Sequence, residues 1–268
     1  KEYVLGLDPN MSDSPSADFF GMALIEVDKE TNTGTLVHSY AGLGSLNKHV
    51  SYLYYILSNF EVSLIIADNA GSDMFFDSCN NSEVFKKNKI NLKNIDFHSD
   101  YEGTEYTKEV RNLKRQYNKE NNQILIQQVF SSSWIRKANE LLQANIDYKK
   151  IWFASRSAAN QAAFERQSNV YIDLKLLDEE NLGMFIETQD NLIYQTKKQC
   201  ALVEVKTTAK GTQSFDLPQH LRRNTSANRA RKDNYTALLL ANWGLKCYFD
   251  MESYKIDDNA TTFTPRLV

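Results

Sequence analysis

Short apolar runs alternate with amphipathic stretches along this chain and predict a mixed α/β fold. The runs at 3–8, 19–28 and 35–42 are separated by turn-like polar segments, as in strands that follow one another in a meander. The run at 62–68 is almost continuously apolar, which is typical of a strand covered on both faces of a sheet. The first third of the chain therefore predicts a sheet that starts antiparallel and continues with a buried strand.

Apolar positions at helical spacing predict helices between and after these strands. We expect helices at 46–60, about 74–88, 105–119, 131–146 and 178–200, and a last helix from about residue 233. We expect further strands at 92–98 and 151–155, and a hairpin at 201–218 that turns at 209–211. A meander followed by alternating strands and helices predicts a mixed sheet with helices on both faces.

Composition adds limits to this picture. The chain of 268 residues is 42% hydrophobic and 24% charged, which suits one large domain over 1–268, with a frayed tail from about 250. No stretch approaches the roughly 20 apolar residues of a membrane span. Cys79, Cys200 and Cys247 lie far apart and form no CxxC pair, so we expect reduced thiols and no zinc site.

Two of the predicted strands end in aspartate. Asp8 closes the strand at 3–8, and Asp68 closes the strand at 62–68. Sites in open α/β sheets form at the carboxyl ends of strands, so two such strands lying parallel and adjacent would bring these carboxylates together. Like charges at that separation repel unless a cation lies between them. Asp8 alone is as readily a turn residue. With Asp233 as a third acid, the cluster predicts a site for Mg²⁺ or Mn²⁺, which prefer oxygen ligands.

Asp233 stands between a cluster of cations and an uncharged run. Residues 237–241, "ALLLA", read as the buried start of a helix. One interpretation of Asp233 is a helix N-cap, because aspartate is a preferred cap and its charge suits the helix dipole. The other is a third ligand of the predicted metal site. The two are compatible, since one carboxylate oxygen can accept a backbone N–H while the other binds metal.

A local basic stretch precedes Asp233, although the whole chain carries a net charge of −3. Residues 220–232 contain five cations and no acid. These cations are Arg222, Arg223, Arg229, Arg231 and Lys232. Such a run is most often a solvated loop. Beside an acidic metal site it also suits the backbone of duplex DNA, because phosphate contacts position a duplex without reading its sequence.

Four polar residues are secondary candidates for the site. Asp18 follows the loop after the first strand, and Asp73 either adds a carboxylate or caps the next helix. His220 and Lys232 are candidates for orienting water or phosphate. For each of them a structural role in a polar loop competes with the functional one.

The order of these motifs resembles the nuclease domain of the large terminase subunit of phages, the motor that packages viral DNA. The resemblance spans residue 3 to about 250 and lies in the stretches 3–28, 63–73, 215–218 and 229–243. In that family an RNase H-like fold carries three acids, two at strand ends and one at the start of a late helix. Asp8, Asp68 and Asp233 fall on those positions, and Asp18 falls on an additional aspartate of the first motif.

The resemblance implies an endonuclease that cuts double-stranded viral DNA with little sequence specificity. It implies hydrolysis assisted by two Mg²⁺ or Mn²⁺ ions, with no side-chain nucleophile. It further implies the host cytoplasm as location, a monomeric isolated domain, and the portal and small terminase subunit as partners of the full-length protein. Large subunits also carry a packaging ATPase, but this chain has no Gly-Lys pair and hence no phosphate-binding loop, so we expect the nuclease part alone.

Three other interpretations remain open on the sequence. One is another RNase H-like nuclease, such as a Holliday-junction resolvase or a transposase core. The second is a non-catalytic module that binds DNA or docks on the portal, although such a module gains nothing from carboxylates facing phosphate. The third is an actin-like ATPase, which the glycine-free loop after Asp8 disfavours.

Overall fold

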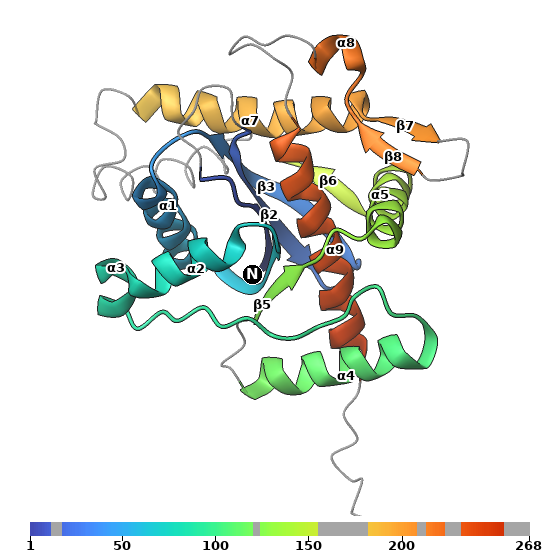
Figure 1. Ribbon diagram of the computed structural model, residues 1–268, viewed down its shortest axis with the longest axis horizontal. Helices are drawn as coiled ribbons and strands as arrows, with labels where there is room; N and C mark the ends of the chain where they lie inside the picture. The colour runs from blue at the N-terminus through green and yellow to red at the C-terminus, as the bar shows by residue number, and fades with distance from the viewer. Residues whose placement is uncertain (12–17, 120–123, 155–181, 208–212, 223–231, 255–268) are drawn as a thin grey trace, which may run out of the picture.

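A computed structural model of the chain describes residues 1–11, 18–119, 124–154, 182–207, 213–222 and 232–254 (Figure 1). It contains a six-stranded mixed sheet flanked by helices and a separate two-stranded hairpin. No helix among these ranges is both long enough and apolar enough to cross a bilayer. The predicted mixed α/β architecture with an added hairpin is confirmed.

The strand order of the main sheet is β5-β4-β1-β2-β3-β6. Its strands are β1 (Glu2–Asp8), β2 (Phe20–Asp28), β3 (Thr33–Gly42), β4 (Glu61–Asp68), β5 (Ile124–Gln128) and β6 (Ile151–Phe153). β1, β2 and β3 form the antiparallel meander, β4 and β5 add in parallel beside β1, and β6 pairs in parallel with β3. This is the RNase H-like arrangement, with β1 between a parallel and an antiparallel neighbour.

Helices cover both faces of this sheet. They are α1 (Leu46–Asn59), α2 (Ser72–Asn81), α3 (Glu83–Lys87), α4 (Gly103–Lys119), α5 (Ser132–Asp147), α7 (Leu182–Leu202), α8 (Gln219–Arg222) and α9 (Asp233–Ser253). One core lies between the sheet and α4, α5 and α9; a second lies between the sheet and α1, α2 and α3. Val4 belongs to the first core while Leu5 and Leu7 belong to the second, which explains why the β1 sequence is apolar on both faces.

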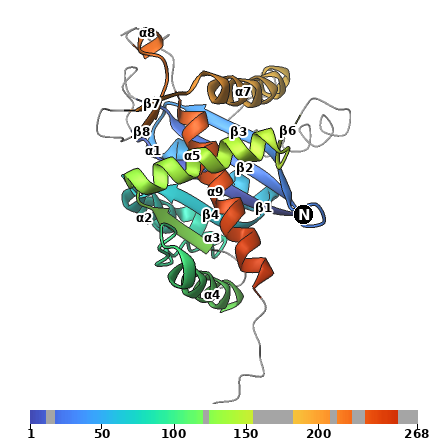
Figure 2. The same cartoon turned by 90° about the vertical axis from the view of Figure 1, so that its right-hand side faces the viewer.

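The C-terminal helix α9 lies unusually close to the middle of the sheet, with α5 beside it (Figure 2). A Cβ on Gly6 would fall 2.1 Å from the carbonyl oxygen of Ala237, and one on Gly21 would fall 2.6 Å from that of Asp233. On the helix side, a Cβ on Gly244 would fall 2.8 Å from Val4. Glycine at these positions therefore permits α9 to approach the sheet backbone, and the helix is buried on nearly all sides.

The strand predicted at 92–98 is wrong. Only an isolated bridge at Asn94 pairs with β5, and the Asn80 side chain hydrogen-bonds both the N–H and the C=O of Leu92. A side chain thus takes backbone groups that a strand ladder would need. The true fifth strand is β5, whose sequence "ILIQQ" lies between the predicted helices at 105–119 and 131–146 and was not predicted.

Two other expectations need adjustment. The helix predicted at 74–88 is two helices, because the side chain of Ser82 accepts the N–H of Phe85 and starts a new helix there. The hairpin is β7 (Glu204–Thr207) paired with β8 (Gln213–Asp216), and its predicted turn at 209–211 lies outside the described residues. Helix α9 continues to Ser253, and the remainder of the predicted frayed tail, from 255, also lies outside them.

Candidate active site

Asp8 and Asp68 lie side by side at the carboxyl ends of β1 and β4, two neighbouring inner strands of the sheet. β1 and β4 are parallel, and Leu7 is paired with Ala67, so the next residues of the two strands are the two aspartates. Neighbouring strands are about 4.8 Å apart, and the charge of Asp68 acts on the carboxyl group of Asp8. The sequence-based expectation that two strand-end acids would meet is confirmed by this register.

Asp233, the first residue of α9, lies at the same end of these strands. Gly21 is the β2 partner of Asp8, and the backbone of Asp233 occupies the space where a Gly21 side chain would be. Asp233 is only 5% exposed. The start of α9 is therefore docked directly beside Asp8, although more than 200 residues separate the two in sequence.

The carboxyl group of Asp8 carries the electrostatic signature of this crowding. Burial is the largest effect, and the charges of Asp233, Asp68 and Asp18 add to it, raising the pKa of Asp8 to about 8; Lys232 acts in the opposite direction. Burial also raises the pKa of Asp68, partly offset by the N–H of Ala70, which donates to its Oδ1 at 3.1 Å. The charges of three other carboxylates thus act on the carboxyl group of Asp8, at the carboxyl ends of β1 and β4.

Hard oxygen donors in such a cluster fit Mg²⁺ or Mn²⁺, and the mutual repulsion is what a divalent cation would relieve. The side chains do not already surround one point: within the described ranges no group of three or more His, Cys, Asp or Glu residues forms a ready-made metal site. The residues fit a divalent metal in donor type and in charge.

The two auxiliary acids differ in where they point. Asp18 is exposed just before β2, and its charge acts on Asp8. Asp73 lies in the first turn of α2, where its carboxylate accepts a hydrogen bond from the side chain of Gln127 on β5. Asp18 therefore joins the cluster electrostatically, whereas Asp73 links α2 to β5.

Lys232 is the member of the basic stretch that the structure places at the site. Its Nζ lies 3.5 Å from Oδ1 of Asp216 and donates to the carbonyl of Phe215 at 3.3 Å, both on β8. Its charge also acts on Asp8. Asp216 is a neighbour that sequence reasoning missed; the only signal was its place at the end of a hairpin strand shortly before the basic stretch.

The other residues of the basic stretch are less defined. His220 is exposed on the short helix α8, and Arg222 ends that helix. Arg223, Arg229 and Arg231 lie outside the described residues. Their predicted contact with DNA stays a prediction.

The helix-cap interpretation of Asp233 can also be compared with the structure. α9 begins at Asp233, and Lys232 is the N-cap residue, whose side chain makes no capping hydrogen bond. The first helical bond runs from the N–H of Thr236 to the carbonyl of Lys232 at 2.8 Å. Asp233 is thus the first residue of the helix, where a negative charge still suits the helix dipole.

Comparison with solved structures finds large terminase nucleases of phages. The large terminase nuclease of thermophilic phage G20c matches at 12% identity over 89% of this chain and 80% of that chain, with a TM-score of 0.41. The HK97 bacteriophage large terminase matches at 9% identity over 91% of this chain and 39% of that chain, with a TM-score of 0.46. The nuclease domain of the Sf6 large terminase, solved with manganese and beta-thujaplicinol, matches at 8% identity over 92% and 87%, with a TM-score of 0.39.

No protein-family profile and no curated protein sequence matches the chain. The similarity to these solved structures is distant, with identities of 8–12% and TM-scores of 0.39–0.46. Two of these three solved structures are nucleases of phage large terminases, and the third is a phage large terminase of which this chain matches 39%.

Proposed function

We propose that this chain is a metal-dependent endonuclease that cuts double-stranded DNA during packaging of a viral genome. The observation that carries the proposal is the cluster of carboxylates from β1, β4 and the start of α9, which raises the pKa of Asp8. A cluster of this kind costs stability unless a proton or a cation neutralises it, and perturbed carboxylates are typical of functional sites. Carboxylate ligands suit a divalent metal and the neighbouring lysine suits a phosphate, and this combination supports nuclease activity.

In this proposal Asp8, Asp68 and Asp233 hold the metal, and Asp18 supplies an outer carboxylate. When bound there, two Mg²⁺ or Mn²⁺ ions would supply the chemistry of an activated water and of a stabilised 3′ leaving oxygen. Asp8 is the central ligand of the three. Its strand, β1, lies between β4, which ends in Asp68, and β2, against which the start of α9 with Asp233 packs. No side chain needs to form a covalent bond to DNA, so the role of the protein is to place carboxylates and phosphate against each other.

The proposed DNA contact lies on the side of Lys232 and the basic stretch. The charge of Lys232 acts on Asp8 while its Nζ contacts Asp216 and Phe215 of β8, and a bound phosphate would replace these two contacts. The members of this stretch are Arg222, Arg223, Arg229, Arg231, Lys232 and His220. Contacts of this kind bind backbone phosphates, which agrees with cutting that has little sequence preference. In the assembled packaging machine, we expect the portal and the small terminase subunit as partners, in the host cytoplasm.

One observation favours a second candidate, a non-catalytic module that binds DNA or docks on the portal. The described part of the chain contains no ready-made set of three metal-ligating side chains. A domain that had lost its activity while keeping its fold would show this as well.

Plasmid cleavage separates the candidates. Supercoiled plasmid is incubated with the protein in Mn²⁺, Mg²⁺ or EDTA, and Asp8→Asn and Asp233→Asn are compared with Asp77→Asn, an exposed carboxylate on α2. We expect cutting with metal by wild type and Asp77→Asn, and none by the two site variants. Wild-type protein that binds DNA with a steep salt dependence but never cuts supports the non-catalytic module. Cleavage confined to four-way junctions supports a resolvase.

A further inference from the structure

The two residues after Asp233 are both buried and both bonded to other elements. Asn234 is 3% exposed and Tyr235 is 6% exposed, in the first turn of α9. Surface helices usually begin with polar residues in solvent, and their first N–H groups bind water or a local cap. Here the first turn of α9 is held from two sides by α7, β3 and α5.

Gln199 of α7 caps this helix from outside. Its side-chain oxygen accepts the backbone N–H of Tyr235 at 2.9 Å, and its amide nitrogen lies 3.4 Å from Oδ1 of Asn234. The N–H of Tyr235 is one of those at a helix start that have no partner within the helix. Lys232 makes no side-chain capping hydrogen bond. Gln199, from a different helix of the same chain, therefore accepts the N–H that a local cap residue would accept in other helices.

A chain of hydrogen bonds continues from Asn234 into the protein. Asn234 Nδ2 donates to Ser39 Oγ at 2.9 Å, and Ser39 and Thr196 hydroxyls are 2.9 Å apart. The Thr196 hydroxyl donates to the carbonyl of Leu192 at 2.7 Å. A hydroxyl has one proton to donate, so Ser39 must donate to Thr196. The order is therefore Asn234 to Ser39 to Thr196 to Leu192, with each hydroxyl donating once and accepting once.

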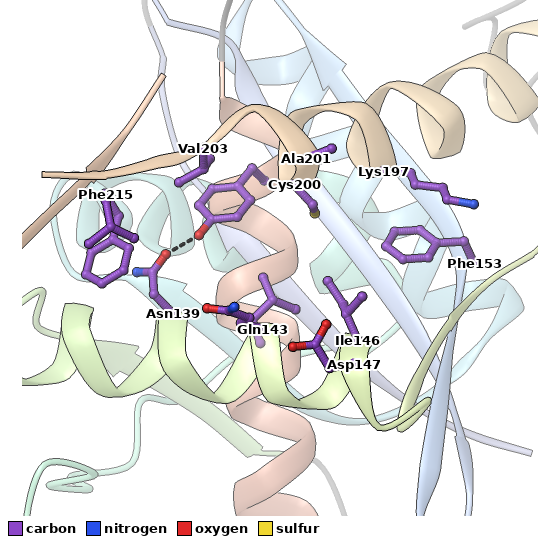
Figure 3. Close-up of a pocket in the computed structure, with 13 residues that line it drawn as sticks. Asn139, Gln143, Ile146, Asp147, Phe153, Lys197, Cys200, Ala201, Val203 and Phe215 are labelled. Carbon is purple, nitrogen blue, oxygen red and sulfur yellow. Dashed lines mark hydrogen bonds between the residues drawn. The ribbon is translucent and has the colours of Figure 1, made fainter. Parts of the chain in front are cut away.

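Tyr235 is fixed on the other side of the helix. Its hydroxyl donates to Oδ1 of Asn139 on α5, drawn as the dashed line in Figure 3. The ring forms part of the wall of a cavity of about 450 Å³, which Cys200 and Phe215 also line. The start of α9 is thus braced between α5 and α7, and the brace ends one residue from Asp233.

We propose that Asn234 and Gln199 are positioning residues that hold the carboxylate of Asp233 beside Asp8 for metal binding. This inference rests on the proposed nuclease function, since it assigns the same site its support. Buried polar networks that are fully satisfied fix one arrangement of the groups they join. Residues that orient metal ligands without touching the metal change metal affinity when they are removed.

The test compares Asn234→Ala and Gln199→Ala with a matched control, Asn242→Ala. Asn242 is also fully buried on α9 and bonded to α5, accepting from Asn145 at 2.8 Å, but lies roughly 13 Å further along the helix axis from Asp233. Mn²⁺ affinity is measured by electron paramagnetic resonance of the free ion, and the melting temperature is measured in EDTA. We expect the Kd for Mn²⁺ to rise about tenfold in both positioning variants and to stay at the wild-type value in Asn242→Ala.

Cleavage rates provide a second readout. At saturating Mn²⁺ the two positioning variants should regain a rate close to that of wild type, because the ligands themselves remain. Folded variants whose Mn²⁺ affinity matches that of Asn242→Ala would overturn the positioning role. If Asn234→Ala does not fold, Gln199→Ala decides alone, since Gln199 is only half-buried. Wild type that binds no Mn²⁺ would overturn the proposed function and this inference together, whereas unchanged affinity in the variants alone would overturn only the latter.

Discussion

Gly21 is the strand partner of Asp8, and the backbone carbonyl of Asp233 lies where the side chain of residue 21 would be. The contact joins the first two strands to the last helix at the point where their acids meet. It makes the absence of a side chain at residue 21 a condition of the site.

Gly21→Ala should therefore disrupt the site through the backbone. The added Cβ would fall 2.6 Å from the Asp233 carbonyl oxygen, so α9 must shift, at a cost of about 1–3 kcal/mol in unfolding free energy. We expect Mn²⁺ affinity to fall more than stability alone explains. Gly34→Ala is the control: its Cβ would crowd Ile25 and Leu245 side chains in the same core, far from Asp8 in the sheet. Equal Mn²⁺ affinity in the two variants would show that the packing of Gly21 against the Asp233 carbonyl does not position the metal site.

Asp8→Asn should stabilise the metal-free protein while removing its activity. Asp8 is buried among Asp233, Asp68 and Asp18, so replacing its carboxyl with an amide relieves repulsion and desolvation. We expect a gain on the order of 1–3 kcal/mol in unfolding free energy in EDTA near pH 8. Chemical denaturation with and without Mn²⁺ measures it. An Asp8→Asn protein that is less stable than wild type in EDTA would show that repulsion and burial do not destabilise the Asp8 carboxylate.

Acid should destabilise the protein through His38. This side chain is fully buried beside Tyr52, with His38 Nε2 2.5 Å from the tyrosine hydroxyl, and burial lowers the pKa of His38 to about 3. The ordinary histidine pKa is 6.5, so the unfolded state binds a proton between pH 6.5 and 3 that the folded state refuses. Stability is present above pH 6.5 and is lost as pH falls toward 3.

Denaturation midpoints from pH 7 to pH 4.5 measure this loss. His38→Gln, which keeps a hydrogen-bonding group, should flatten the dependence, whereas His98→Gln, with a side chain 54% exposed, should not. An unchanged slope in His38→Gln would assign the acid sensitivity to other groups.

Lys232→Ala should weaken DNA binding uniformly across sequences. A lysine that contacts one phosphate contributes about one unit to the slope of log affinity against log salt, so the slope should fall by about 1. Binding is measured by fluorescence anisotropy in EDTA at several salt concentrations. Lys87→Ala is the control, because α3 packs on the face of the sheet opposite α9. An unchanged slope in Lys232→Ala would place the DNA elsewhere.

The meander, the β4 strand and the start of α9 could be predicted because each produces a pattern of apolar and polar residues within its own stretch of sequence. Strand-end acids and the uninterrupted apolar run of α9 needed no partner to be recognised. β5 was missed because "ILIQQ" is only five residues long and begins only five positions after the end of a long helix at Lys119. The segment at 92–98 has buried Leu92, Ile95 and Phe97, a pattern that mimics a strand, while the side chain of Asn80 on α2 bonds the backbone N–H and C=O of Leu92.

The support of Asp233 could not be predicted in the same way. Gln199 and Asn139 lie on two different helices, and nothing in their own neighbourhoods marks them as partners of α9. The close approach of Gly21 likewise depends on which strand lies under the helix. Such contacts belong to the tertiary arrangement, and only local signals such as Asp233 itself are visible in sequence.

A crystal grown with Mn²⁺ and examined by anomalous diffraction at the manganese edge tests the central claim most directly. We expect at least one Mn²⁺ within about 2.3 Å of carboxylate oxygens from Asp8 and from Asp68 or Asp233. Manganese bound elsewhere, with these three carboxylates left together and free of metal, would contradict it.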